Sequence, residues 1–132
     1  MAVRALRGAI TVDVDTPEEI RLRTVELLRT IFERNDLSLD DVISILFTAT
    51  EDVASLPPAA GARGFGLVDV PLLCAQEMPT DGGLEQCIRL MLHIESDKPK
   101  SELRHVFLRG ATRLRPDLAE PGDESFGRSG DD

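Results

Sequence analysis

Apolar residues recur at every second position near the beginning of the chain, and this period predicts a β-strand over residues 3–13. One side of this strand carries Arg4, Leu6, Gly8, Ile10 and Val12. The other side carries Val3, Ala5, Arg7, Ala9 and Thr11. The strand therefore has two distinguishable faces, and Arg7 lies on the one without the large aliphatic residues.

The period changes to that of an α-helix over residues 15–36. Thr16 is the expected N-cap, Pro17 suits the first helical position, and Glu19 completes a capping box. Asn35 is the expected left-handed stop. The apolar stripe of the helix comprises Ile20, Val25, Leu27, Leu28, Ile31 and Phe32. The charged positions form a solvated face made of Glu18, Glu19, Arg21 and Arg23.

Four later segments predict further strands. Residues 41–52 are apolar on both faces, with Val42 and Leu46 on one side and Ile43, Ile45 and Phe47 on the other, which is typical of a central strand covered on both sides. Residues 67–79 contain Pro71 and predict an edge strand or a bend. Residues 84–95 predict a long strand, with a helix as the alternative, because a double glycine precedes them and a proline follows. A short strand is expected at residues 105–107.

Between these segments the pattern predicts a 3₁₀ turn at residues 37–41, a short helix at 58–64 and a helical turn at 109–114. With 132 residues, the chain is long enough for one domain with its own core. We assign that domain to residues 1–119. Residues 120–132 are acidic and rich in Gly, Ser and Asp, so we expect a disordered tail there.

The net charge of −9 argues against a nucleic-acid binder, and it means that an anionic ligand must be attracted by a local group of arginines. No apolar run approaches the roughly 20 residues of a membrane span, and the first ten residues lack the apolar segment of a signal peptide. We therefore expect a soluble, cytoplasmic protein. Cys74 and Cys87 form no CxxC pair, and His93 and His105 show no ligand spacing with them, so reduced thiols and no metal are expected.

An arginine lies in the middle of the apolar run "QCIRLMLHIES", residues 86–96. If this strand alternates, Arg89 shares a face with Cys87, Met91 and His93, while the opposite face is aliphatic and packs on the helix. Because a guanidinium costs several kcal/mol to desolvate without a partner, Arg89 needs an explanation. Arg7 repeats this arrangement on the first strand.

Two strands thus each place an arginine on a second, largely uncharged face. One long helix cannot cover both faces of the sheet, so we expect another subunit to cover the second face, with an anion-binding pocket at the seam. Arginine suits such a site because its planar fork matches carboxylates and stays charged. The alternative is that Arg89 is an edge residue or pairs with an acid such as Glu77. Arg63, among small residues, adds a third candidate cation.

The chain resembles the monofunctional, trimeric chorismate mutases of the Bacillus type. The resemblance runs in order from residue 3 to residue 119 and is carried by "RGAITV", "DTPEEI", "CAQEM", "GGLEQCIRLMLHI" and "RHVFLRGATRLRPDL". It implies an α+β fold with a mixed β-sheet and flanking helices, assembled as a homotrimeric pseudo-α/β-barrel with active sites between subunits. It also implies the rearrangement of chorismate to prephenate in phenylalanine and tyrosine biosynthesis, without a cofactor or metal.

The resemblance implies roles for individual residues. Arg89 matches the arginine that donates to the ether oxygen of the breaking bond, and Arg7 matches one that holds a substrate carboxylate. Glu77 and Cys74 match residues that face the ring hydroxyl. The remaining substrate-binding positions are Ala59, Arg63, Leu73, Ala75, Gln76, Phe107, Leu114 and Arg115. Arg63 matches a mobile arginine at the pocket mouth, and the last two match a segment that closes over the ligand.

The sequence departs from the family pattern at four positions: Pro57 replaces an aromatic residue, Ala60 a lysine, Leu73 a threonine and Phe107 a tyrosine. These departures affect substrate capture and leave Arg7, Cys74, Glu77 and Arg89 in place. Two other functions are compatible with the arginine pattern. One is a non-catalytic trimeric module that binds an anionic aromatic metabolite, and the other is a Rid-type deaminase, whose motifs are not visible here.

Overall fold

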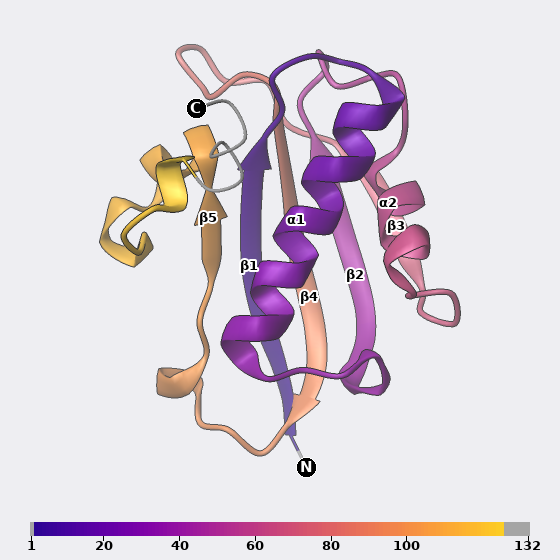
Figure 1. Cartoon of the computed structure of the whole chain (residues 1–132), viewed down its shortest axis with the longest axis vertical. Coiled ribbons are helices and arrows are strands. Elements are labelled where there is room, and N and C mark those ends of the chain that lie inside the picture. The colour runs from indigo at the N-terminus through magenta and orange to yellow at the C-terminus, as the bar shows by residue number, and fades with distance from the viewer. Residues whose placement is uncertain (1, 126–132) are drawn as a thin grey trace.

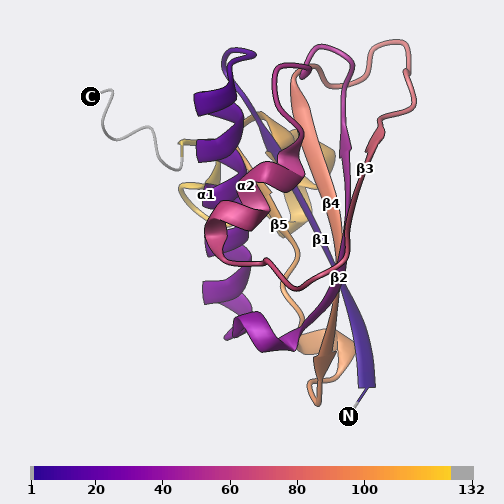
Figure 2. The same ribbon diagram turned by 90° about the vertical axis from the view of Figure 1, so that its right-hand side faces the viewer.

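The computed structural model describes residues 2–125. Its centre is a five-stranded sheet in the order β3-β2-β4-β1-β5. Two helices, α1 (Pro17–Asn35) and α2 (Pro58–Phe65), cover the same face of this sheet (Figures 1 and 2). Among residues 2–125, no α-helix lies on the other face (Figure 2). The strands are β1 (Ala2–Thr11), β2 (Val42–Ala49), β3 (Leu72–Gln76), β4 (Cys87–Ser96) and β5 (Val106–Leu108).

The central strand β4 pairs antiparallel with β1 on one side and with β2 on the other, whereas β5 joins β1 in parallel and β3 joins β2 in parallel. The sheet is therefore mixed, as expected. The segment predicted as a strand at residues 84–95 forms β4 over Cys87–Ser96 and is not a helix, and β3 is an edge strand that begins directly after Pro71. The aliphatic faces of β1 and β4 meet α1 in one core, which contains Leu6, Ile10, Leu27, Ile31, Ile88, Leu90, Leu92 and Ile94.

Helix α1 begins as predicted, but two details of its ends differ. The Thr16 hydroxyl accepts the Glu19 backbone N–H at 3.2 Å, as an N-cap should. The Glu19 carboxylate accepts the backbone N–H of Asp13 at 3.0 Å, so it binds the preceding loop instead of completing a capping box. At the other end, Asp36 and not Asn35 takes the left-handed conformation, with φ of 54°. The predicted stop was therefore wrong by one residue.

Strand β2 also differs from the prediction in which residues share a face. A β-bulge between Val42 and Ser44 inserts one residue, so Val42 joins Ile45 and Phe47 in the core. Ile43 and Leu46 point to the helix-free face, where they are 38% and 40% exposed. The sequence predicted that both faces of this strand are covered, but within a single chain the helices cover only one of them.

Asn35 connects the end of α1 to the segment before β5. Its side-chain amide donates to the carbonyls of Ile31 and Arg104, both at 2.9 Å, and its carbonyl accepts the Arg104 N–H at 2.8 Å. Asn35 is 1% exposed, so these partners replace water completely. The residue that was expected to stop the helix therefore positions the chain that leads into β5.

The chain after β5 forms short 3₁₀ turns: η3 (Arg109–Leu114), η4 (Pro116–Leu118) and η5 (Asp123–Ser125). They lie beside β5 at the edge of the sheet (Figure 1). Asp123 is 1% exposed and accepts two hydrogen bonds from Arg34 of α1, at 2.7 and 3.3 Å. The packed part of the chain thus extends beyond residue 119, where we ended the domain. Residues 126–132 of the predicted tail lie outside the described residues.

We predict that Asn35→Ala lowers the free energy of unfolding by about 2–3 kcal/mol, because the variant leaves the backbone N–H and C=O groups of Arg104 without their partner. Urea unfolding measures this change. Asp36→Gly is the matched control, since glycine adopts the left-handed conformation without strain and should leave stability unchanged or slightly raised. Equal losses in the two variants would contradict the role assigned to Asn35.

Candidate active site

The helix-free face of the sheet aligns side chains in two rows across the strands. In one row Leu73, Leu46, Met91 and Arg7 lie opposite one another, and in the next row the corresponding residues are Ala75, Thr48, Arg89 and Ala9. A hollow of about 220 Å³ lies over these rows and is lined by Arg7, Leu46, Thr48, Glu77, Arg89, Leu90 and Met91. The structure therefore brings Arg7, Glu77 and Arg89 together, as predicted from the two faces.

Arg89 lies beside Glu77 but is not hydrogen-bonded to it. The Arg89 Nε atom is 3.5 Å from Glu77 Oε1, and it is buried without a hydrogen-bond partner among the described residues. The same Glu77 oxygen accepts the Thr48 hydroxyl at 2.6 Å. Thr48, which the sequence analysis did not single out, thus fixes the carboxylate at this distance from the guanidinium. The ion-pair alternative for Arg89 holds in part, because Glu77 neutralises the charge and leaves N–H donors for a ligand.

Arg7 is held between an aromatic ring and a histidine. Its guanidinium carbon lies 5.9 Å from the centre of the Phe107 ring, which is within the range of a cation–π contact. Its backbone N–H donates to His105 Nδ1 at 2.9 Å, so this nitrogen carries no proton. Burial, with the nearby charges of Arg7 and Arg115, lowers the pKa of His105 below its usual value. His105 therefore stays neutral near pH 7 and adds no positive charge.

The C-terminal turns bring two more predicted residues to this side. Leu114 packs on a small cluster of Ala9, Cys87, Phe107 and Ala111. Arg115 is exposed and binds Asp117 through two hydrogen bonds at 2.9 and 3.1 Å. Phe107 is 1% exposed, so it supports Arg7 from within the cluster. Arg7, Glu77, Arg89, Phe107, Leu114 and Arg115 form what we call the arginine group.

The remaining predicted residues lie elsewhere. Cys74, Ala75 and Gln76 line a second hollow of about 340 Å³ between the end of β3 and the start of α2, where Pro57 and Pro58 form its other wall. Ala59 is 6% exposed and packs in the core, so its methyl group does not face this hollow. Arg63 is exposed on α2 and has no hydrogen bond or ion pair within residues 2–125. We call Arg63, Cys74, Ala75 and Gln76 the β3–α2 group.

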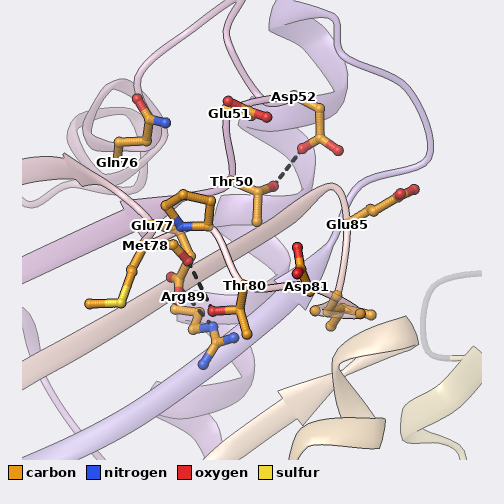
Figure 3. Close-up of a pocket in the computed structure, with 14 residues that line it drawn as sticks. Thr50, Glu51, Asp52, Gln76, Glu77, Met78, Thr80, Asp81, Glu85 and Arg89 are labelled. Carbon is orange, nitrogen blue, oxygen red and sulfur yellow. Dashed lines mark hydrogen bonds and ion pairs between the residues drawn. The ribbon is translucent and has the colours of Figure 1, made fainter.

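A third, acidic hollow joins the two groups at the end of the sheet (Figure 3). Arg89 and Glu77 form its floor, and Glu77 points toward Arg89 while Gln76 points away from it (Figure 3). Four more carboxylates line the hollow: Glu51, Asp52, Asp81 and Glu85. Within residues 2–125, His, Cys, Asp and Glu side chains form no cluster suited to a metal ion. None of the helices in this part of the chain is long and apolar enough to cross a bilayer.

Comparison with known proteins agrees with this arrangement. The family model for chorismate mutase type I matches residues 3–118. The chorismate mutase AroH of Thermus thermophilus is 48% identical over 117 residues, which cover 88% of this chain and 96% of that protein. The AroH protein of Bacillus subtilis is 43% identical over 120 residues, covering 90% and 94% of the two chains. A solved chorismate mutase from Clostridium thermocellum superposes with a TM-score of 0.82 at 44% identity, covering 84% of this chain and 99% of that one.

The fold and the arrangement of arginines on its helix-free face define a type I, AroH-like protein. The chain belongs to the chorismate mutase type I family. The resemblance stated from the sequence motifs is therefore confirmed, and so is the mixed sheet with flanking helices.

The two cysteines differ sharply in environment, and we predict that only one reacts in the folded protein. Burial raises the pKa of Cys87 to about 11, although the charge of Arg89 opposes this shift, whereas Cys74 is exposed. A disulfide reagent at pH 8 should therefore label one thiol per chain in buffer and two in guanidinium chloride. Cys74→Ala should abolish the native reaction and Cys87→Ala should leave it intact; rapid labelling of Cys87 in native protein would contradict its burial.

Proposed function

We propose that the chain catalyses the intramolecular rearrangement of chorismate to prephenate, a step toward phenylalanine and tyrosine. The observation that carries this proposal is the buried Arg89 Nε, which lacks a hydrogen bond in a hollow shared with Arg7 and Glu77. Buried donors are almost always satisfied, so an unsatisfied one in a hollow indicates that a ligand completes it. Family membership identifies the ligand class as chorismate.

The chemistry needs a fixed positive charge more than it needs a nucleophile or a base. In this unimolecular rearrangement a C–O bond lengthens, and its oxygen gains negative charge in the transition state. A guanidinium held beside that oxygen binds the transition state better than the ground state. About 4 kcal/mol of such stabilisation corresponds to roughly a thousandfold in rate. Arg89 is suited to this because the sheet holds its backbone rigidly between β1 and β2.

The other residues of the arginine group bind and orient the dianion. Arg7 provides a second guanidinium in the same hollow, and Glu77 offers a carboxylate to the ring hydroxyl. Holding chorismate in its compact conformer contributes an orientation term that is separate from the charge of Arg89. The Thr48 hydroxyl keeps Glu77 beside Arg89 without letting it occupy the guanidinium fully. Leu114 and Arg115, on the C-terminal turns, close this side of the site.

We infer that the complete site lies between two copies of the chain and that the assembly is a homotrimer. Within one chain Arg7 lies with Arg89 and Glu77 in one hollow, whereas Cys74 and Ala75 line another. Of the β3–α2 group only Gln76 also reaches the acidic hollow beside Glu77 and Arg89, so no hollow of a single chain offers all the predicted ligand contacts. The helix-free face also exposes Val3, Ile43, Leu46 and Leu73, with exposed fractions from 38% to 64%. A face of this kind is typical of a subunit interface. A second copy can bury it and bring the two groups together.

The free cysteines fit a reducing compartment, since one of them is exposed and neither forms a disulfide. We therefore place the enzyme in the cytoplasm. The proposed reaction itself needs no cofactor or metal.

We predict that Arg89→Ala lowers kcat by roughly a thousandfold or more while KM changes far less, because the lost interaction is strongest in the transition state. Replacing Arg89 with citrulline, which keeps the shape and removes the charge, should have a similar effect. Arg89→Lys should recover only part of the activity, since lysine lacks the planar fork. The loss of chorismate absorbance measures all three rates.

The control is Arg4→Ala, because Arg4 lies on β1 but donates to the Lys98 carbonyl on the other side of the sheet. It should leave kcat and KM unchanged. A variant Arg89→Ala with full kcat and only a raised KM would show that the charge merely binds substrate. Wild-type protein that binds chorismate without converting it would favour the non-catalytic module.

A subunit-mixing experiment tests the shared site. We predict that Arg89→Ala and Cys74→Asp are each inactive as pure proteins, the second because a carboxylate in the β3–α2 group repels the dianion. When the two are co-expressed with different tags, trimers that contain both variants should regain activity at about a third of their sites, because one of the three sites takes an intact group from each chain. Light scattering should show a trimer. Mixed assemblies without activity, or a monomer in solution, would contradict the shared site.

A further inference from the structure

A buried arginine outside the site has no part in the mechanism described so far. Arg109 is the first residue after β5, is 6% exposed, and has a left-handed backbone with φ of 55°. A residue with a Cβ rarely adopts this conformation, and it persists only where surrounding contacts enforce it. The next residue, Gly110, donates its backbone N–H to the Thr11 hydroxyl at 2.9 Å. The chain therefore turns sharply between Phe107 and the C-terminal turns.

The contact that enforces this turn is a buried ion pair with α1. Arg109 Nε lies 3.2 and 3.3 Å from the two Glu26 oxygens, and a terminal nitrogen of Arg109 lies 3.2 Å from Glu26 Oε1. Glu26 is itself only 8% exposed and also accepts Arg23 at 2.6 Å. Both Glu26 oxygens are thus engaged, and the Arg109 fork has a fixed orientation.

A buried pair of this kind contributes little net stability compared with apolar residues of the same volume, because desolvating the two charges offsets their attraction. What it supplies is a defined geometry. Arg109 opens η3, which carries Leu114 at its end and leads directly into Arg115. The direction in which the chain leaves Arg109 therefore determines where Leu114 and Arg115 lie.

A second buried pair holds the far end of the same segment. Asp123 binds Arg34, eight residues after Glu26 on α1, and also accepts the Glu120 backbone N–H at 2.8 Å. Residues 109–123 are thus attached to α1 at both ends by buried ion pairs. Leu114 and Arg115 lie between the two attachments, on the Arg7 side of the molecule.

We propose that Arg109 and Glu26 are positioning residues, which hold the segment carrying Leu114 and Arg115 against the arginine group. The proposal deepens the function proposed above and rests on it. Within residues 2–125 the polar partners of the Arg109 side chain are Glu26 and Asp13, so it acts through the placement of the segment. It follows that removing the pair disturbs substrate capture more than folding, and that its effect depends on Arg115.

A double-mutant cycle tests this dependence. Arg109→Met keeps an unbranched apolar stem and removes the guanidinium, and with it the pair. We expect it to raise KM about tenfold with a smaller change in kcat, and we expect Arg115→Ala to do the same. The double variant should be little worse than either single one, because a misplaced segment no longer presents Arg115 to the ligand. Arg109→Lys should recover only part of the loss.

Arg113→Met is the matched control, since Arg113 lies on η3, is exposed, and forms no hydrogen bond or ion pair among residues 2–125. It should leave KM unchanged. If the KM of the Arg109→Met, Arg115→Ala double variant rises by the product of the two single increases, the proposal is overturned. A loss of activity that is explained entirely by a lower melting temperature would also overturn it. Where Arg109→Met folds poorly, Glu26→Gln, which keeps the shape of the side chain, is expected to give the same KM pattern.

Amide hydrogen exchange provides a readout that does not need chorismate. In Arg109→Met and Glu26→Gln, residues 110–118 should exchange at least about tenfold faster than in the wild type, while β1 and β4 remain protected. Unchanged exchange in residues 110–118 would overturn the positioning role even if the protein is an active mutase. A wild-type protein without mutase activity would instead overturn the proposed function, whatever the exchange shows.

Discussion

The structure depends most on one constraint: a permanent positive charge is built into the middle of a sheet and is only partly satisfied there. Arg89 lies on the central strand β4, so β1 and β2 fix its backbone on both sides. Its nearest counter-charge, Glu77, is held at 3.5 Å by Thr48 rather than drawn into a direct hydrogen bond. A fully paired arginine would be stable and inert, whereas in the proposed mechanism this one keeps donors for a charge that appears only during reaction.

The same constraint underlies the proposal that one chain offers an incomplete site. A guanidinium gains most where water is excluded, yet the helix-free face of a single chain is open, with Leu46 and Leu73 40% and 64% exposed. Both helices are committed to the other face (Figure 2). Excluding water from the helix-free face around Arg7 and Arg89 therefore requires either a second copy of the chain or the chain's own C-terminal turns. The proposed site uses both. The negative net charge makes this local arrangement necessary, because the protein as a whole repels a dianion.

Most of the fold could be predicted from the sequence because alternation and helical periodicity are local and strong, as in β1, α1 and β4. The errors arose where a non-local contact prevailed. The bulge in β2 moved Val42 to the other face, and Asn35 was recruited by Arg104 far along the chain, which left Asp36 to take the left-handed position. For the site, the alternation along the strands correctly placed Arg7 and Arg89 on one face. No local signal in the sequence marks the role of Thr48, and none shows that Cys74 and Arg89 line different hollows.

The buried pairs on α1 show how such non-local contacts reach the site. Strand β5 is only three residues long, too short to fix the direction of the chain that follows it. Arg109 is paired with Glu26 and Asp123 is paired with Arg34. The direction of the chain after β5 is therefore set by α1. The helix thus has two tasks: its apolar stripe supports the strand that carries Arg89, and its acidic and basic side chains orient the segment that carries Arg115. A change on α1 that leaves the core intact can therefore still alter substrate capture, because it acts on the segment and not on the sheet.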